Sequence, residues 1–417
     1  MYLGLRVRAG VCKRLGKNLI LFISLTRTGI KPMSNMIQCL HAGYLIDGTG
    51  NPIQKNVVLF VKNNRIIGIE PFHETLKNKI THNLSNHTIF PFLADAHVHL
   101  AMSGTLDLQT RREQLSMSFN QAKNQISNHL DQYAKAGIIV VRDGGDHFGH
   151  TFQYKKRFNH VVDILSPKMA WYRSNRYGQF AGKSIEQNTN CCEIISAQHE
   201  GSHIKIIQSG INSVRQFGKE TKPQFFQDEL TSICKWADQQ NIPVMVHANG
   251  IQPVAIAINA GCTSIEHGYF MGDHNLKKMA EKQIYWVPTL IPMYVLAQNL
   301  NTSEERDIAL RTFDSQYEQL VKAKEWGVPI VIGSDAGSFG VNHVQGLFDE
   351  MNMMRSCGLS LSQIIRSCTA LSMSLFYRSN CGILQKGDLA KLVAMASRSI
   401  HSNGFALMDI VCYHSFE

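Results

Sequence analysis

The chain has 417 residues, of which 44% are hydrophobic and 18% charged, with only 11 prolines. This is the composition of an ordinary globular protein that can bury one large domain and one small one. The net charge of +10 does not indicate a nucleic-acid partner, because seven basic and no acidic residues lie in 1–35 and leave the rest at +3. No basic stripe interleaved with aromatic residues runs through that rest, so no nucleic-acid partner is expected.

We expect residues 1–35 to form a basic leader or disordered tail. The apolar run Leu19 to Leu25 follows basic residues, but it lacks a small-x-small cleavage site and is too short to span a bilayer, so no membrane partner is expected. We expect folded protein to begin near Met33 or Met36, with an upstream start codon as the favoured origin of the leader. The ten cysteines include no Cys-x-x-Cys pair, which predicts a reduced, cytoplasmic protein.

Between 36 and 90, short alternating segments are separated by Gly and Asn turns, a pattern that predicts the first part of a small β-sandwich. Its strands are expected at Cys39 to Ile46, Asn56 to Lys62 and Arg65 to Glu70. After residue 90, apolar strand-like runs alternate with long helical stretches, including Leu106 to Ala136 and Ser303 to Trp326. The runs follow Ile89 to Leu93 at Ile138 to Val141, His203 to Ile207, Pro243 to His247, Thr263 to His267, Tyr285 to Val287 and Ile330 to Ile332.

Strands that alternate with helices imply parallel βα units, and about eight such units fit a (β/α)₈ barrel over residues 91–380. The last β-like segments, Lys386 to Ala394 and Ala406 to Cys412, return to the N-terminal sandwich, whose second part is 381–417. The predicted fold class is therefore α/β, a TIM barrel with a small β-sandwich formed by both ends of the chain. The barrel's active site is expected where its strands end and its loops begin.

The sequence Asp95-Ala96-His97-Val98-His99 follows the first apolar run of this barrel. Alternate residues of a strand share a face, so His97 and His99 can bind one ion together. Neutral imidazole is the commonest metal ligand in proteins. Two histidines alone are equally compatible with solvated strand residues, so the argument needs further ligands.

Four more candidates stand at the ends of predicted strands: Lys205, His247, His267 and Asp335. Each alone has an ordinary interpretation, such as a hydrogen-bonded structural histidine or an aspartate that caps a helix. In a closed barrel all of them converge on the carboxyl-end face, where active sites lie. Their joint placement predicts a metal-dependent catalytic site.

With these residues the chain resembles the amidohydrolase superfamily, metal-dependent hydrolases built as a (β/α)₈ barrel with a discontinuous β-sandwich. The resemblance spans about residues 36 to 412. It rests on the turn Asp47-Gly48-Thr49-Gly50, on the Asp-x-His-x-His sequence and on the four residues at later strand ends. Gly137 to Asp143 and Gly333 to Gly337 are most similar to the imidazolonepropionase-like and Xaa-Pro dipeptidase-like branches.

Alternation places Lys205 on the inner face of its strand. A protonated ammonium about 4 Å from a divalent ion would be repelled by about 8 kcal/mol at an effective dielectric constant of about 20. In binuclear members of the superfamily this lysine is carboxylated, and the resemblance therefore implies two divalent ions, with Zn²⁺ favoured, bridged by carboxylated Lys205. A lysine that points away from a mononuclear site stays open as the alternative.

The resemblance implies a role for each of the six residues. One metal would be held by His97, His99 and Asp335, the other by His247 and His267, with carboxylated Lys205 and a hydroxide as bridges. Asp335 would pass a proton from that hydroxide to the leaving amine of a small-molecule substrate. The scissile C–N bond belongs to an amide, a peptide or a cyclic amide.

Two other functions remain as alternatives. A mononuclear aminohydrolase that acts on a ring amidine usually has an acidic residue soon after the strand-five histidine, whereas Ala248-Asn249-Gly250-Ile251 follows His247 here. A scaffold relative without activity would have lost metal ligands. The predicted substrate contacts are loop residues: Arg176, Tyr177, His147, His150 and the pair Asn342-His343. The sequence leaves the oligomeric state open, with a homo-oligomer among the expectations.

Overall fold

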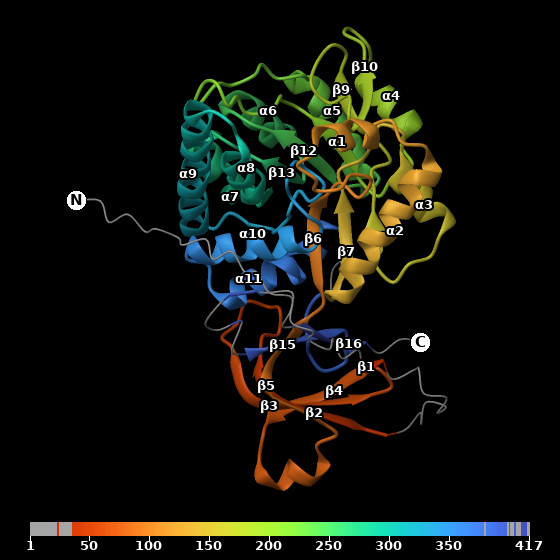
Figure 1. Cartoon of the computed structure of the whole chain (residues 1–417), viewed down its shortest axis with the longest axis vertical. Coiled ribbons are helices and arrows are strands. Elements are labelled where there is room, and N and C mark those ends of the chain that lie inside the picture. Colours follow the sequence, from red (N-terminus) through yellow and green to blue (C-terminus); the bar gives the residue numbers. More distant parts are fainter. Residues whose placement is uncertain are drawn as a thin grey trace, which may run out of the picture.

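The computed structural model describes residues 23–24, 36–378, 381–397, 400, 404–405 and 410–414. The predicted basic leader, except Ile23 and Ser24, and residues 406–409 of the last predicted strand lie outside the described residues. Figure 1 shows two parts, a sheet at one end of the molecule and a larger body of helices and strands at the other. Among the residues that the structure describes, no helix is both long and apolar enough to cross a membrane.

The smaller part is one seven-stranded sheet with the order β1-β16-β15-β5-β2-β3-β4. Its strands are β1 (Ile23–Ser24), β2 (Gln38–Leu45), β3 (Gln54–Lys62), β4 (Arg65–Pro71), β5 (His82–Pro91), β15 (Leu392–Ala396) and β16 (Ile410–His414). Because β15 pairs antiparallel with β5, the two ends of the chain share this sheet, as the sequence predicts. The described strands form one hydrogen-bonded sheet, so the predicted sandwich is seen only in part, and a short helix, η1 (Glu74–Lys79), covers part of it.

The larger part contains two parallel sheets. A three-stranded sheet has the order β6-β7-β8, and a six-stranded sheet has the order β10-β9-β11-β12-β13-β14. Their bounds are β6 (Leu93–Val98), β7 (Ile138–Asp143), β8 (Asp163–Leu165), β9 (Ala170–Arg173), β10 (Gly182–Ile185), β11 (Ile204–Ile207), β12 (Val244–Ala248), β13 (Ser264–His267) and β14 (Tyr285–Val287). The α/β class with parallel strands agrees with the prediction from the sequence.

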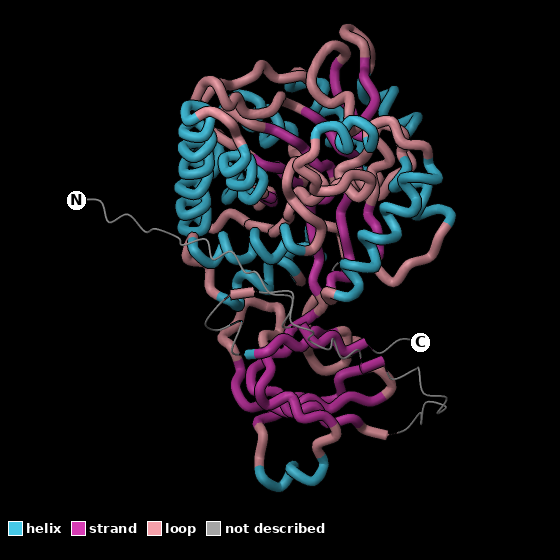
Figure 2. The backbone as a smooth tube through the Cα atoms, in the orientation of Figure 1, coloured by secondary structure: helices cyan, strands magenta, loops and turns pink. Residues whose placement is uncertain are grey.

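Helices surround these two sheets (Figure 2). They are α1 (Leu108–Gln114), α2 (Phe119–Lys135), α3 (His150–Arg157), α4 (Cys191–Gln198), α5 (Gln227–Gln239), α6 (Ile251–Ala260), α7 (Gly272–Lys282), α8 (Leu290–Asn299), α9 (Ser303–Trp326), α10 (Gln345–Ser356), α11 (Leu361–Cys368) and α12 (Ala370–Leu375). Helix α9 has the predicted bounds, because Thr302 caps its first turn and Gly327 at φ 78° ends it. The predicted helix Leu106 to Ala136 is divided into α1 and α2, since Ser118 and Gln121 form a capping box that starts a new helix.

Residues 329–336 connect the two parallel sheets. On one side the Val331 N–H donates to the Trp286 carbonyl at 2.8 Å, and on the other the Asp335 N–H donates to the His97 carbonyl at 2.7 Å. The predicted strand Ile330 to Ile332 is thus held by isolated bridges, Trp286 with Ile330 and Val98 with Ala336. These bonds hold the segment between β14 and β6 and place Asp335 beside the carboxyl end of β6, which is what positions the site.

Candidate metal centre and catalytic site

All six predicted metal ligands line one cavity of about 430 Å³. They come from β6, β11, β12, β13 and the segment that joins the two sheets. The remaining lining residues are Met102, Arg111, Leu115, Tyr177, Phe180, Ala181, Ile207, Ile211, Asn212, Asn249, Tyr269, Thr289, Pro292, Met293, Leu296, Gly337, Ser338 and Phe339. The volume lies in the range of ligand pockets, and the lining combines a few polar groups with a mostly apolar wall.

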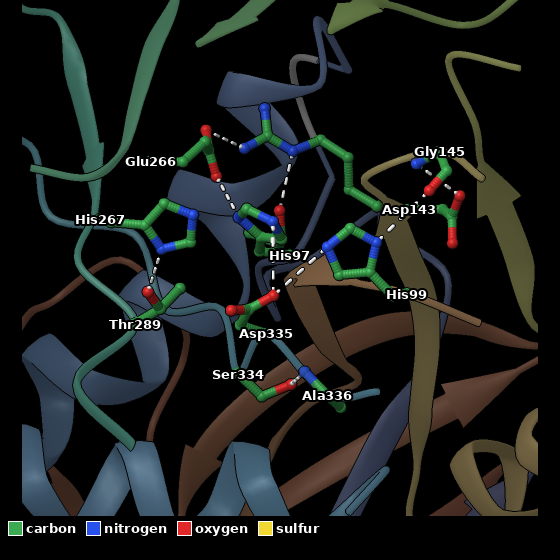
Figure 3. Close-up of polar contacts among 12 residues, drawn as sticks. His97, His99, Asp143, Gly145, Glu266, His267, Thr289, Ser334, Asp335 and Ala336 are labelled. Atoms are coloured by element: carbon green, nitrogen blue, oxygen red, sulfur yellow. Dashed lines mark hydrogen bonds and ion pairs between the residues drawn. The ribbon is translucent and has the colours of Figure 1, made fainter. Parts of the chain in front are cut away.

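Three of the six residues form a compact group that could hold a metal ion: His97, His99 and Asp335. One ligand atom of each lies within 4.8 Å of the others. Asp335 Oδ1 lies 3.4 Å from His99 Nε2 and 3.7 Å from His97 Nε2. Figure 3 shows the two imidazoles and the carboxylate pointing toward one another. The i and i+2 spacing therefore brings His97 and His99 to one possible metal ion, as the sequence predicts.

His247 and His267 lie next to this group. Their rings are 4.6 Å apart between centroids, and the His267 ring is 5.0 Å from that of His97. They come from the carboxyl ends of the neighbouring strands β12 and β13, in the register where His267 faces Ala248. The structure therefore brings together four histidines and one aspartate from four segments of the chain.

Lys205 points into the same cavity from β11. Its neighbours Ile204 and Ile206 face the helix-side hydrophobic core, while Ile207 lines the cavity with it. The Lys205 Nζ is buried and has no hydrogen-bond partner among the described residues. Burial lowers the pKa of Lys205 to about 8, although nearby Glu266 opposes this. An orphaned buried amine of lowered pKa fits a lysine whose nitrogen carries a further group.

In each of the four histidines, one ring nitrogen is held by a hydrogen bond or polar contact to the protein. This contact orients the ring and directs the second nitrogen toward the cavity. His97 Nδ1 donates to Glu266 Oε2 at 2.7 Å, and His267 Nδ1 lies 2.6 Å from Thr289 Oγ1. His99 Nδ1 contacts the Gly145 carbonyl at 3.4 Å, so on His97 and His99 it is Nε2 that faces Asp335. His247 has the opposite arrangement, because its Nε2 lies 3.3 Å from the Gly210 carbonyl and leaves Nδ1 free.

Glu266 is a functional residue that the sequence patterns did not single out. It is fully buried and accepts from Arg142 Nη2 at 2.7 Å and from the Ser264 hydroxyl at 2.5 Å, besides holding His97. Arg142, also fully buried, donates from Nε to the Ala96 carbonyl. The available signal was its position directly before His267 in a buried strand. A buried carboxylate requires a charged or hydrogen-bonding partner, which predicts a polar network at this place. The pair fixes the His97 tautomer from behind the cavity.

Two aspartates organise the loops around the site. Asp95 accepts from the Ser334 N–H at 2.9 Å and from the Ser334 hydroxyl at 2.5 Å, which ties β6 to the segment that carries Asp335. Asp143 accepts from the N–H groups of Leu100 and Gly145, so it braces the loop after β7. Gly144 has to be glycine, because a Cβ there would lie 2.6 Å from the His99 ring.

Backbone strain is concentrated in the same place. His267, Thr289 and Asp335 have φ values of 66°, 47° and 54°, in the left-handed region that residues other than glycine seldom adopt. Each such residue costs about 1–3 kcal/mol and persists only where the surroundings impose it. At Asp335 the imposing contact is the bond from its N–H to the His97 carbonyl. The fold thus gives up stability to fix the positions of these side chains.

Burial also sets the protonation of the ligands. It lowers the pKa of His99 to about 4 and of His247 to about 3, and it lowers the pKa of His97 and His267 well below the usual value. Burial raises the pKa of Asp335 to about 7, while the Lys205 charge opposes the rise. Neutral imidazoles and a carboxylate are the donors that zinc prefers. The residues present therefore fit divalent metal ions.

The predicted substrate contacts are spread over several places. Tyr177 lines the main cavity, and its ring lies 5.6 Å from that of His247. Arg176 and His147 line a neighbouring cavity instead. His150 bonds to the Met117 carbonyl, and His343 is buried between the Met102 carbonyl and the Tyr133 hydroxyl. Only Tyr177 of these five lines the main cavity, whereas Arg111, Asn249 and Tyr269, which were not predicted as contacts, line it too.

The chain is similar in sequence to several known proteins. Ochratoxinase of Aspergillus niger is 27% identical over 173 residues, which cover 40% of this chain and 34% of that protein. The chain thus matches about a third of the length of this curated relative. Imidazolonepropionase of Cutibacterium acnes is 24% identical over 196 residues, or 45% of each protein.

A solved structure shows that the fold is shared as well. The crystal structure of a Xaa-Pro dipeptidase with bound methionine superposes with a TM-score of 0.76 at 24% identity, covering 91% of this chain and all of the other. The model of the amidohydrolase family matches residues 88–410, which include all six candidate ligands. The resemblance seen in the sequence is confirmed: this chain belongs to the amidohydrolase family.

Proposed function

We propose that the protein is a metal-dependent amidohydrolase that cleaves a C–N bond in a small amide, peptide or cyclic amide. The observation that carries the proposal is the convergence of four neutral histidines, Asp335 and the unpartnered Lys205 on one cavity. The family and the dipeptidase name of the solved relative support a hydrolase of C–N bonds. The catalytic body would be a closed (β/α)₈ barrel at 91–380, with 36–90 and 381–417 as the second domain and 1–35 as a leader.

The site would hold two divalent ions, with zinc favoured by its nitrogen and carboxylate donors. His97, His99 and Asp335 would hold one ion and His247 and His267 the other, with carboxylated Lys205 between them. Bound ions of this kind lower the pKa of water and polarise a carbonyl group. Asp335, whose Oδ1 lies 3.4 Å from His99 Nε2, would accept a proton on its carboxylate and return it to the leaving nitrogen.

A mononuclear aminohydrolase is the second candidate, because only three of the six residues form the compact group. Against it, Asn249 rather than a carboxylate lies in the cavity after His247, so no acidic shuttle follows that strand. The eight cysteines whose side chains are described are all free, which supports a reduced, cytoplasmic location. A small-molecule substrate and a homo-oligomeric state remain part of the proposal.

Metal analysis of the purified protein tests the binuclear scheme. Wild type, expressed with zinc and bicarbonate, should contain two ions per chain, and Lys205→Ala should contain one or none. Lys183→Ala, which removes an exposed lysine on β10, is the matched control and should retain two. One ion in wild type and in Lys205→Ala alike would exclude the bridging lysine and favour the mononuclear alternative.

A further inference from the structure

Outside the candidate metal centre, the charged groups of the cavity are positive only. Apart from the six candidate ligands, Arg111 is the only charged side chain among the described lining residues. Asp335 is the only acid there, and it belongs to the metal centre. A substrate that enters this cavity therefore meets a positive group and no negative one beyond the metal centre.

Arg111 is held in place rather than free to move. It lies on α1, and its Nη1 donates to the carbonyls of Gly337 at 3.1 Å and Ser103 at 3.2 Å. Gly337 follows Asp335 by two residues, so these bonds tie the guanidinium to the segment that carries the candidate catalytic carboxylate. The remaining donors, Nε and Nη2, have no hydrogen-bond partner among the described residues. They form the edge of a guanidinium that binds a carboxylate through two parallel hydrogen bonds.

Around Arg111 the wall of the cavity is apolar. Leu115, one turn further along, lines the cavity together with Phe180, Ile211, Leu296 and Phe339. Such a wall favours an apolar substituent, whereas a single fixed guanidinium favours one anionic group beside it. The two features together describe a ligand with a carboxylate and a bulky apolar group.

Arg176 and Arg112 do not share this environment. Arg176 lines the neighbouring cavity, and its Nη2 donates to the Lys222 carbonyl. Arg112 follows Arg111 directly but is exposed and does not line the cavity. Of the three arginines, Arg111 alone joins the metal centre and the apolar wall.

We infer that Arg111 is a specificity-determining residue that binds a carboxylate of the substrate, so the preferred substrates are amides that carry a free carboxylate and a bulky apolar group. This inference rests on the proposed hydrolase function. The Nη1 contacts fix the orientation of the guanidinium, and the Nε and Nη2 edge receives the carboxylate. The scissile carbonyl of the same substrate then lies toward the histidines and Asp335.

A pair of probes that differ only in charge tests this role. N-benzoyl-phenylalanine and its carboxamide both release benzoate on cleavage of the same bond, and benzoate is quantified by chromatography. With the zinc-loaded wild type, kcat/KM should be about 10- to 100-fold higher for the carboxylate, the range expected for a charge-assisted pair. Arg111→Met should lose this preference by slowing only the carboxylate substrate, and Arg111→Lys should retain part of it.

Two arginine variants serve as controls. Arg112→Met should behave as wild type, and so should Arg176→Met. Equal slowing of both probes in Arg111→Met would mean that Arg111 only supports the loop at Gly337, and would overturn the inference. It would also be overturned if wild type showed no preference, or if Arg176→Met rather than Arg111→Met abolished it.

A binding measurement separates this inference from the hydrolase proposal. If wild type cleaves neither probe, the proposed reaction fails for this bond, and calorimetric titration with 4-phenylbutanoate and 4-phenylbutanamide decides the role of Arg111. Weaker binding of the carboxylate by Arg111→Met, about 10-fold or more, would support the inference. Equal carboxylate affinity in wild type and Arg111→Met would overturn it, because binding would then depend on other groups.

Discussion

The inner end and the mouth of the cavity are built differently. At the inner end, His97, Glu266 and Arg142 are buried and bonded to one another, and a strained backbone holds His267 and Asp335 in place. At the mouth, the lining is apolar and partly exposed, with Ile211 60% and Leu115 42% accessible.

This difference separates two tasks. A buried polar network tolerates little change, because a group that loses its partner incurs the full desolvation penalty. Exposed apolar residues can be exchanged with little loss of stability. We therefore expect changes at the inner end to alter metal binding and kcat, and changes at the mouth to alter KM.

The largest effect on activity is expected from changing Asp335, the carboxylate at the inner end of the cavity. Asp335→Asn keeps the size of the side chain but removes its ability to carry a proton, so kcat should fall by about 10²- to 10⁴-fold. Benzoate release from an N-benzoyl amino acid measures this loss, and circular dichroism monitors the fold. Asp307→Asn, an exposed change on α9, should have no effect. An Asp335→Asn enzyme with more than about a tenth of wild-type kcat would contradict the acid–base role.

Glu266 tests whether the network behind the cavity acts on the metal. Glu266→Gln removes the charge that orients His97 and compensates Arg142, so zinc affinity should fall by about 10- to 100-fold. Competition with a chromophoric chelator measures the affinity. Ser264→Ala is the matched control, since Ser264 contacts Glu266 and Arg142 but not His97. If both variants lowered zinc affinity equally, the effect would be general loosening rather than His97 orientation.

The sequence predicts the inner end better than the mouth for a physical reason. His97, His247 and His267 lie at or next to the carboxyl ends of β6, β12 and β13, and the period of two in a strand predicts which side chains share a face. Lys205 on β11 could be oriented in the same way, with Ile204 and Ile206 turned toward the helices. Parallel strands bring their carboxyl ends together, so strand periodicity predicts that these side chains share one cavity. It does not predict the left-handed backbone of His267 and Asp335.

Residues on loops and in long-range contacts were much harder to predict. Arg111 lines the cavity from the short helix α1 and donates to the Gly337 carbonyl, a contact over 226 positions that no local pattern reveals. His343 follows the last sheet segment as a substrate contact would, yet it packs on His129 with ring centroids 3.8 Å apart. The strand at Ile330 to Ile332 formed isolated bridges instead of a regular ladder, because Ser334 and Asp335 bend to meet Asp95 and His97.

Asp95 connects the two sheets beneath the site and should matter mainly for stability. Asp95→Ala leaves the Ser334 N–H and hydroxyl without their buried acceptor, which should reduce the free energy of unfolding by about 1–3 kcal/mol. Urea titration followed by tryptophan fluorescence measures this change. Tyr133→Phe removes the longer 3.3 Å bond to Asp95 and the 3.1 Å contact to His343 Nδ1 but keeps both serine contacts, so it should cost less. A loss as large in Tyr133→Phe as in Asp95→Ala would contradict the dominant role of the serine contacts.

The smallest effect is expected at the mouth, where Ile211→Ala removes part of the apolar wall. Because Ile211 is 60% exposed, the free energy of unfolding should change by less than about 0.5 kcal/mol. The substrate loses apolar contact worth about 1 kcal/mol, so KM should rise about fivefold while kcat stays unchanged. Steady-state kinetics with N-benzoyl-phenylalanine checks this, and Ile67→Ala, an exposed change in the separate sheet, is the control. A fall in kcat at constant KM would show that the mouth, like the inner end, positions the reacting groups, and the division between the two ends would not hold.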